Sequence, residues 1–177
     1  MKMTRWWTKT RGLPQEAYNC WVSALRAQPG RQVRVLAWAK TPDGYCVGSP
    51  SALSFGDETG WSHIGWHQIE MGGWDADTGR LSWSLYGGER GSVELIEVGR
   101  LPELFRERVS ASIVLEKFIP IHNRRGVLIS GRRDLADVDA PITWNSTLRG
   151  GLTWDTEGVQ AATDRAIAQV RTEYGGS

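Results

Sequence analysis

Turn residues recur so closely between positions 33 and 98 that this part of the chain has no room for a long helix. Between the turns apolar and polar residues alternate, as in LSWSL at 81–85. A period of two residues indicates strands that bury one face. Stretches such as TPDG at 41–44 and DADTG at 75–79 supply the residue types that tight turns require. The pattern predicts a meander of about seven short strands in a closed or nearly closed antiparallel structure.

Helical spacing is found on both sides of this meander. Apolar residues at intervals of three and four predict a helix between Pro14 and Pro29, and LPELFRERV predicts another at 101–109. Beyond it we expect strands at 111–121, 127–131 and 142–148, and a last helix at 156–174. The chain then divides into an arm, an N-terminal helix, a barrel with its closing helix, and a β3α extension, which cover residues 1–12, 13–30, 31–110 and 111–177.

Composition narrows the class of protein. The chain has 177 residues, a formal net charge of +1, and 10 tryptophans whose spread favours Trp as a core residue of a β-rich fold. No apolar run approaches the ~18 residues of a spanning helix, and no signal-like apolar stretch follows the basic start. Two cysteines, Cys20 and Cys46, are too few for a disulfide framework. We therefore expect a cytoplasmic protein, or one peripheral to the membrane, with both thiols in or near the core.

Four stretches carry a resemblance to known proteins: VRVLAWAKTPDGYCVGSPSALSF, IGWHQIEMGGWD, RLSWSL and LPELFRERV. Together they resemble bacterial members of the pleckstrin-homology superfold. Residues 13–175 also resemble an uncharacterised family of small actinobacterial proteins with an RVLAWA strand, an LPELxRERV helix and a C-terminal β3α extension. The resemblance implies a β-rich α+β fold: a pleckstrin-homology-like antiparallel barrel closed by a helix, followed by the extension. Such folds host lipid, peptide and protein binding, so the resemblance implies no particular ligand.

Few residues suggest catalysis or metal binding. His63 and His67 lie four residues apart near Glu70, a spacing that zinc sites use on helices. On a strand the two imidazoles would lie about 13 Å apart, too far for one ion. Asp75 opens a turn, and the chain has no Gly-x-Ser-x-Gly motif and no phosphate-binding loop. We expect no metal, no cofactor and no catalytic residue.

The N-terminal arm is the first candidate binding segment. It combines cations with two indoles and no acidic residue: Lys2, Arg5, Trp6, Trp7, Lys9 and Arg11. Tryptophan favours the membrane interface, and each nearby cation adds about 1 kcal/mol of attraction to anionic lipid. Packing of the indoles on the domain, or contact with another protein, explains the same residues.

A second candidate lies around the expected strand at 127–131, which is flanked by Arg124, Arg125, Arg132 and Arg133. These arginines could form a positive edge for phosphate or an acidic partner. A solvated hairpin that resists edge-to-edge pairing is the favoured explanation of the same residues. Specific nucleic-acid binding is not expected, because no aromatic residue interleaves with them.

The sequence thus favours a non-catalytic cytoplasmic interaction module with an unknown protein partner. The first alternative is peripheral binding to anionic membrane lipid through the arm. The second is a small enzyme of unrecognised type, which would need a pocket that holds two or more of His63, His67, Glu70 and Asp75.

Overall fold

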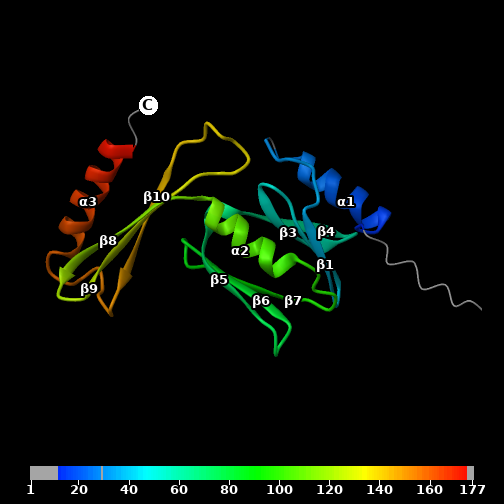
Figure 1. Ribbon diagram of the computed structural model, residues 1–177, viewed down its shortest axis with the longest axis horizontal. Coiled ribbons are helices and arrows are strands. Elements are labelled where there is room, and N and C mark those ends of the chain that lie inside the picture. The colour runs from blue at the N-terminus through cyan, green and yellow to red at the C-terminus, as the bar shows by residue number, and fades with distance from the viewer. Residues whose placement is uncertain (1–11, 29, 175–177) are drawn as a thin grey trace, which may run out of the picture.

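The computed structural model describes residues 12–28 and 30–174, which form three antiparallel sheets and three α-helices (Figure 1). A strand-rich α+β fold is therefore confirmed. In chain order the elements are α1 (Gln15–Arg26), β1 (Ala37–Thr41), β2 (Gly44–Gly48), β3 (Ala52–Asp57), β4 (Gly60–Gly65), the 3₁₀ turn η1 (Trp66–Gln68), β5 (Ile69–Asp75), β6 (Arg80–Leu85), β7 (Arg90–Glu94), α2 (Leu101–Ala111), β8 (Ile113–His122), β9 (Arg125–Arg132), β10 (Thr143–Arg149) and α3 (Val159–Tyr174).

The first two sheets enclose α2. Their strand orders are β1-β2-β3-β4 and β5-β6-β7, and Figure 1 shows the helix lying between them. Leu101, Leu104 and Phe105 on α2 are buried in a core that includes the fully buried Trp66. A Cβ atom at Gly48 would lie 2.4 Å from a methyl of Leu104, so the helix rests directly on the backbone of β2. The expected seven strands and the helix after them are present.

A closed barrel is not found among the described residues. The two sheets are linked there by one isolated bridge between Lys40 and Glu97, where the Ile96 N–H donates to the Lys40 carbonyl at 2.7 Å. The barrel stays open because β7 ends at Glu94, although the alternation of apolar and polar residues in the sequence extends to Val98. Residues beyond Glu94 turn toward α2 before a second ladder forms.

Helix α1 packs on the outside of the first sheet. Its buried Trp21, Val22 and Leu25 form a second core with Val47 on β2. The strand expected from Val33 begins only at Ala37. Residues 33–36 instead approach this second core, and within the described chain their one backbone hydrogen bond to the sheet is from the Leu36 N–H to the Gly48 carbonyl (2.9 Å). Cys46 is buried and Cys20 half-buried, as expected.

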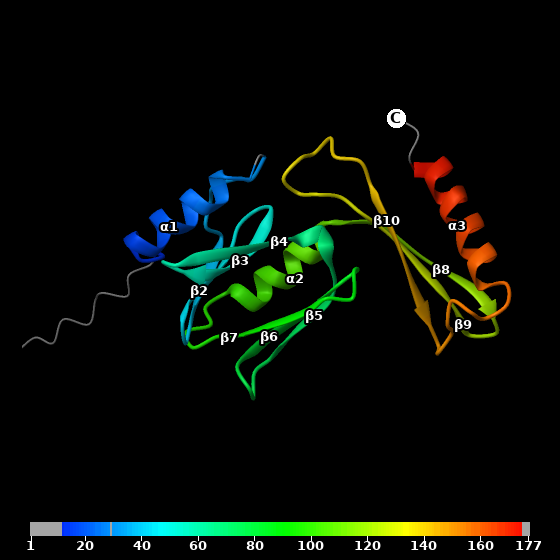
Figure 2. The same cartoon turned by 180° about the vertical axis from the view of Figure 1, so that it is seen from behind.

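The C-terminal half, residues 112–174, is a sheet in the order β10-β9-β8 with α3 on one face (Figure 2). Val127 and Ile129 on β9 pack against Ala166 and Val170 of the helix. The opposite face of the sheet meets the N-terminal half, residues 12–111, at one end and is open at the other. No helix among the described residues is long and apolar enough to cross a membrane.

Candidate binding sites at the junction of the two halves

Arg132 is the centre of the junction. Its side chain is 1% exposed. Nη1 donates to the Val109 carbonyl and the Ser112 hydroxyl, both at 2.9 Å. Nη2 donates to the Ile69 carbonyl at 3.2 Å, and Nε donates to the Tyr86 hydroxyl at 2.9 Å. The expectation that Arg132 belongs to an exposed basic edge is therefore wrong, because neighbouring backbone and hydroxyl oxygens surround it.

Other polar contacts also join the N-terminal half to the C-terminal half. The Tyr86 hydroxyl donates to Ser130 Oγ at 3.0 Å, and the Thr147 hydroxyl donates to the Glu70 carboxylate at 2.6 Å. Ser130 is buried and Glu70 half-buried. The junction is thus built from directional hydrogen bonds, which fix one relative placement of the surfaces they join.

The loop between β9 and β10 ties the halves together at a second place. Leu135 in this loop packs against the N-terminal core, and Ala136 approaches Gly30 at the end of α1. Asp134 Oδ1 lies 3.5 Å from His67 Nδ1, a close electrostatic contact without hydrogen-bond geometry. The loop therefore crosses from the C-terminal sheet onto the N-terminal half.

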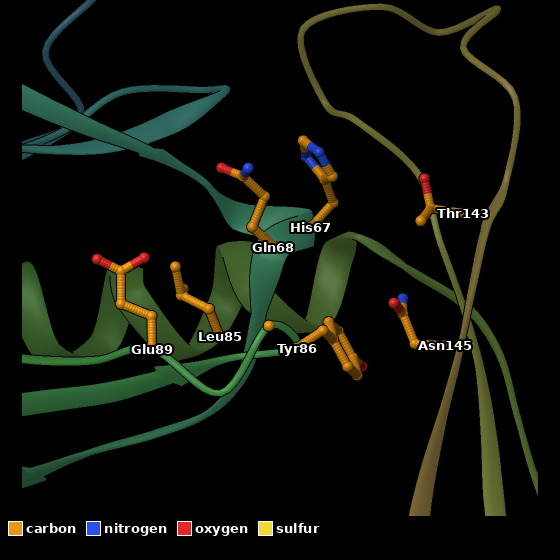
Figure 3. Close-up of a pocket in the computed structure, with 8 residues that line it drawn as sticks. His67, Gln68, Leu85, Tyr86, Glu89, Thr143 and Asn145 are labelled. Carbon is orange, nitrogen blue, oxygen red and sulfur yellow. The ribbon is translucent and has the colours of Figure 1, made fainter.

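A hollow of about 380 Å³ opens beside this junction (Figure 3). Thr143 and Asn145 on β10 face His67 and Tyr86 across it (Figure 3). The Asn145 Nδ2 atom is buried and has no hydrogen-bond partner within the described chain. The complete lining is His67, Gln68, Leu85, Tyr86, Gly87, Glu89, Thr143 and Asn145. It contains hydrogen-bonding groups but no paired nucleophile and base.

The two histidines have different surroundings: His67 borders the hollow, whereas His63 contacts a buried serine. His63 Nδ1 and Ser54 Oγ form a hydrogen bond of 2.7 Å, and Ser54 is fully buried. Burial, with the positive charge of Arg31 as a second cause, lowers the pKa of His63. Burial also lowers the pKa of His67, against the opposing effect of Asp134. Both imidazoles are therefore neutral near pH 7.

The acidic candidates are also separated. Asp75 Oδ1 accepts from the backbone N–H groups of Asp77 (2.9 Å) and Thr78 (3.2 Å), which confirms the interpretation of this segment as a turn. Hydrogen bonds from Thr78 lower the pKa of Asp75. Of His63, His67, Glu70 and Asp75, each hollow described for residues 12–28 and 30–174 borders at most one. No cluster of three metal-ligating side chains occurs in these same ranges.

A second hollow, of about 290 Å³, runs between β5, α2 and β8. The side chains of Phe105 and Val109 border it from α2, and Glu116 borders it from β8. Its β5 wall is the segment 70–74, in which Met71 is 58% exposed. Glu70 is shared with a third hollow of about 490 Å³, bordered by the exposed Trp154. The two hollows adjoin at Glu70, and the smaller one forms a groove along β5.

The basic residues singled out in the sequence do not form one surface. Arg124 and Arg125 are exposed at the β8–β9 turn, where Asn123 has a φ of 55°. Arg133 is half-buried at the other end of β9, and Arg132 lies inside the junction. Lys2, Arg5, Trp6, Trp7, Lys9 and Arg11 lie outside the described residues.

Sequence reasoning singled out Arg132 and Glu70, but it missed Tyr86 and Thr147 and the contacts that join all four. Glu70 lies on β5, Tyr86 follows β6 and Thr147 lies on β10, so no local pattern connects them. The one available signal was Arg132 itself, a charged residue at the end of the apolar run GVLISG. No protein-family model, curated protein sequence or solved structure matches the chain.

Proposed function

We propose that the chain is a non-catalytic interaction module that binds an extended peptide segment of a partner protein along the outer edge of β5. The observation that carries the proposal is an exposed strand edge that borders an apolar groove. The peptide would add one strand to the β5-β6-β7 sheet, so that main-chain hydrogen bonds supply affinity and side-chain pockets supply specificity.

The edge of β5 is available for pairing. Within the described chain β5 pairs with β6 alone, and Met71, Gly72 and Gly73 are exposed. An exposed strand edge presents N–H and C=O groups that another strand can satisfy. A Cβ atom at Gly73 would meet nothing within 4 Å, so the face of β5 opposite α2 is uncovered at this position.

The groove beside the edge offers apolar contacts on two walls. On the α2 wall, β5 runs so close to the helix that a Cβ at Gly72 would lie 2.4 Å from the Phe105 ring. On the β8 wall, Ile113 and Glu116 line the hollow. Val109 of α2 and Ile113 of β8 are half-buried, so an added strand with apolar side chains would contact both.

We infer that residues 31–110 are a pleckstrin-homology-like domain, and the supporting features are sheets of four and three strands followed by a helix. Membership of the actinobacterial family and a cytoplasmic location stay predictions.

The test is selection of peptides from a random display library on the intact protein, followed by affinity measurement with variants. We expect selected peptides with alternating apolar residues. Met71→Asp should weaken binding about ten-fold or more, because it introduces a charge at a desolvated contact. Ile96→Asp is the matched control, since Ile96 is 55% exposed but lies after β7, outside the groove residues.

Two measurements separate strand addition from other binding modes. N-methylation at alternate positions of a selected peptide should abolish binding in one register and spare it in the other. Amide hydrogen exchange at 71–74 should slow on binding. Equal losses for Ile96→Asp and Met71→Asp, or unchanged exchange in β5, would contradict the proposal.

A further inference from the structure

We infer that Arg133 and Arg171 form a binding site for a small organic anion, at a hollow between α3 and the segment that leads into β10. This site is separate from the β5 groove and shares no lining residue with its hollow. Its ligand class is a carboxylate or phosphate ester attached to a flat apolar body.

The hollow has a volume of about 650 Å³, enough for a small organic molecule. Arg133 directly follows β9, and Arg171 lies in the last turn of α3. Two arginines from different elements thus line one hollow. The full lining is Arg133, Val138, Asp139, Ala140, Pro141, Ile142, Trp144, Arg171 and Tyr174.

The charged side chains that line the hollow favour an anionic ligand. Two arginines face one carboxylate, that of Asp139. Throughout the described part of the chain neither arginine forms an ion pair, and the Nε atom of Arg133 is buried with no hydrogen-bond partner. Buried donors are ordinarily satisfied, so the Arg133 Nε atom has hydrogen-bonding capacity left for a bound anion. Guanidinium groups bind carboxylate and phosphate through paired hydrogen bonds.

The remaining walls favour an apolar ring in the ligand. Trp144 is half-buried against the C-terminal core, and Tyr174 is 50% exposed. Ile142 lines the hollow beside them, and Val138, 80% exposed, stands in the wall that the 138–142 segment forms. Flat aromatic faces stack favourably on planar apolar groups. The site therefore combines a charged contact with a stacking surface, which suits an aryl phosphate better than a free inorganic ion.

The test uses phenyl phosphate as the probe, with phenol and inorganic phosphate as comparisons. Binding is measured on the full chain by calorimetry and by NMR of the indole N–H of Trp144, assigned with Trp144→Phe. We expect phenyl phosphate to bind more tightly than either comparison and to shift this resonance. Arg171→Gln should weaken binding about ten-fold or more, the effect of removing one charge-assisted contact. Arg133→Gln should weaken the binding of phenyl phosphate by a similar factor.

Arg165→Gln is the matched control, because Arg165 is exposed on the same helix but does not line the hollow. It should leave affinity unchanged. Arg171 is exposed, so its variant is expected to fold, and thermal unfolding checks this for both variants. The inference is overturned if phenyl phosphate does not bind at millimolar concentration, or if Arg165→Gln weakens binding as much as Arg171→Gln. It is also overturned if inorganic phosphate binds as tightly as phenyl phosphate.

Discussion

Arg132 and Tyr86, 46 residues apart in the sequence, are joined twice in the structure. The Nε of Arg132 donates to the Tyr86 hydroxyl at 2.9 Å, and the guanidinium carbon lies 5.5 Å from the centre of the Tyr86 ring. The hydroxyl in turn donates to Ser130. Among the described residues this buried cation has neutral oxygen partners and a ring face but no carboxylate in ion-pair contact. Its position therefore depends on both halves being in place.

Replacing Arg132 with Met should lower the free energy of unfolding by about 3 kcal/mol or more. The reason is that the carbonyls of Ile69 and Val109 lose a charged donor while they stay buried. Urea unfolding followed by circular dichroism measures the change. Arg124→Met, at an exposed turn, is the control and should stay within about 0.5 kcal/mol of the parent. Equal stability of both variants would contradict a central role for Arg132.

Two adjacent glycines should respond oppositely to the same substitution. Gly72→Ala places a Cβ 2.4 Å from the Phe105 ring and should destabilise the protein by about 1–3 kcal/mol, because β5 or α2 must shift. Gly73→Ala meets open space and should change stability by less than about 0.5 kcal/mol. Thermal unfolding of the two variants side by side gives the answer. A destabilising Gly73→Ala would show that this face of β5 is covered.

Stability should fall as the pH decreases below about 6.5. Burial lowers the pKa of His63 and of His67 in the folded protein below the unfolded value of 6.5. In this range the unfolded chain binds more protons, so the free energy of unfolding decreases as the pH falls. The contribution is complete above the unfolded pKa and diminishes until the folded pKa is passed.

Urea unfolding between pH 5 and pH 7.5 measures this dependence. His63→Asn and His67→Asn should each flatten it, whereas His122→Gln, at an exposed position, should leave it unchanged. If the free energy of unfolding of both His→Asn variants depends on pH as steeply as that of the parent protein, the dependence comes from other groups.

The arm should bring the protein to anionic membranes if the lipid alternative holds. Co-sedimentation with anionic liposomes at low salt should then show binding that disappears at physiological salt and in the double variant Trp6→Ala/Trp7→Ala. Neutral liposomes are the control. Absence of binding to anionic vesicles at low salt would leave packing or a protein contact as the role of these indoles.

The order of elements followed from local chemistry. Alternation in residues 80–85 and the DADTG turn require only neighbouring residues, so they predicted β6 and the turn before it correctly. The apolar face of residues 101–109 likewise predicted α2. Errors arose at element ends, as at β1 and β7, because the pairing partner decides where a ladder stops.

The sequence by itself determined which segments are strands and helices and that the chain is nearly neutral, since these properties depend on residue type and short-range period. Only the tertiary structure decided that Arg132 is buried, that β5 has an open edge, and that Arg133 and Arg171 border one hollow. The period of a strand identifies its two faces but not which distant segment covers each of them. That choice depends on contacts between residues far apart in sequence, and the binding sites proposed for this protein arise from those contacts.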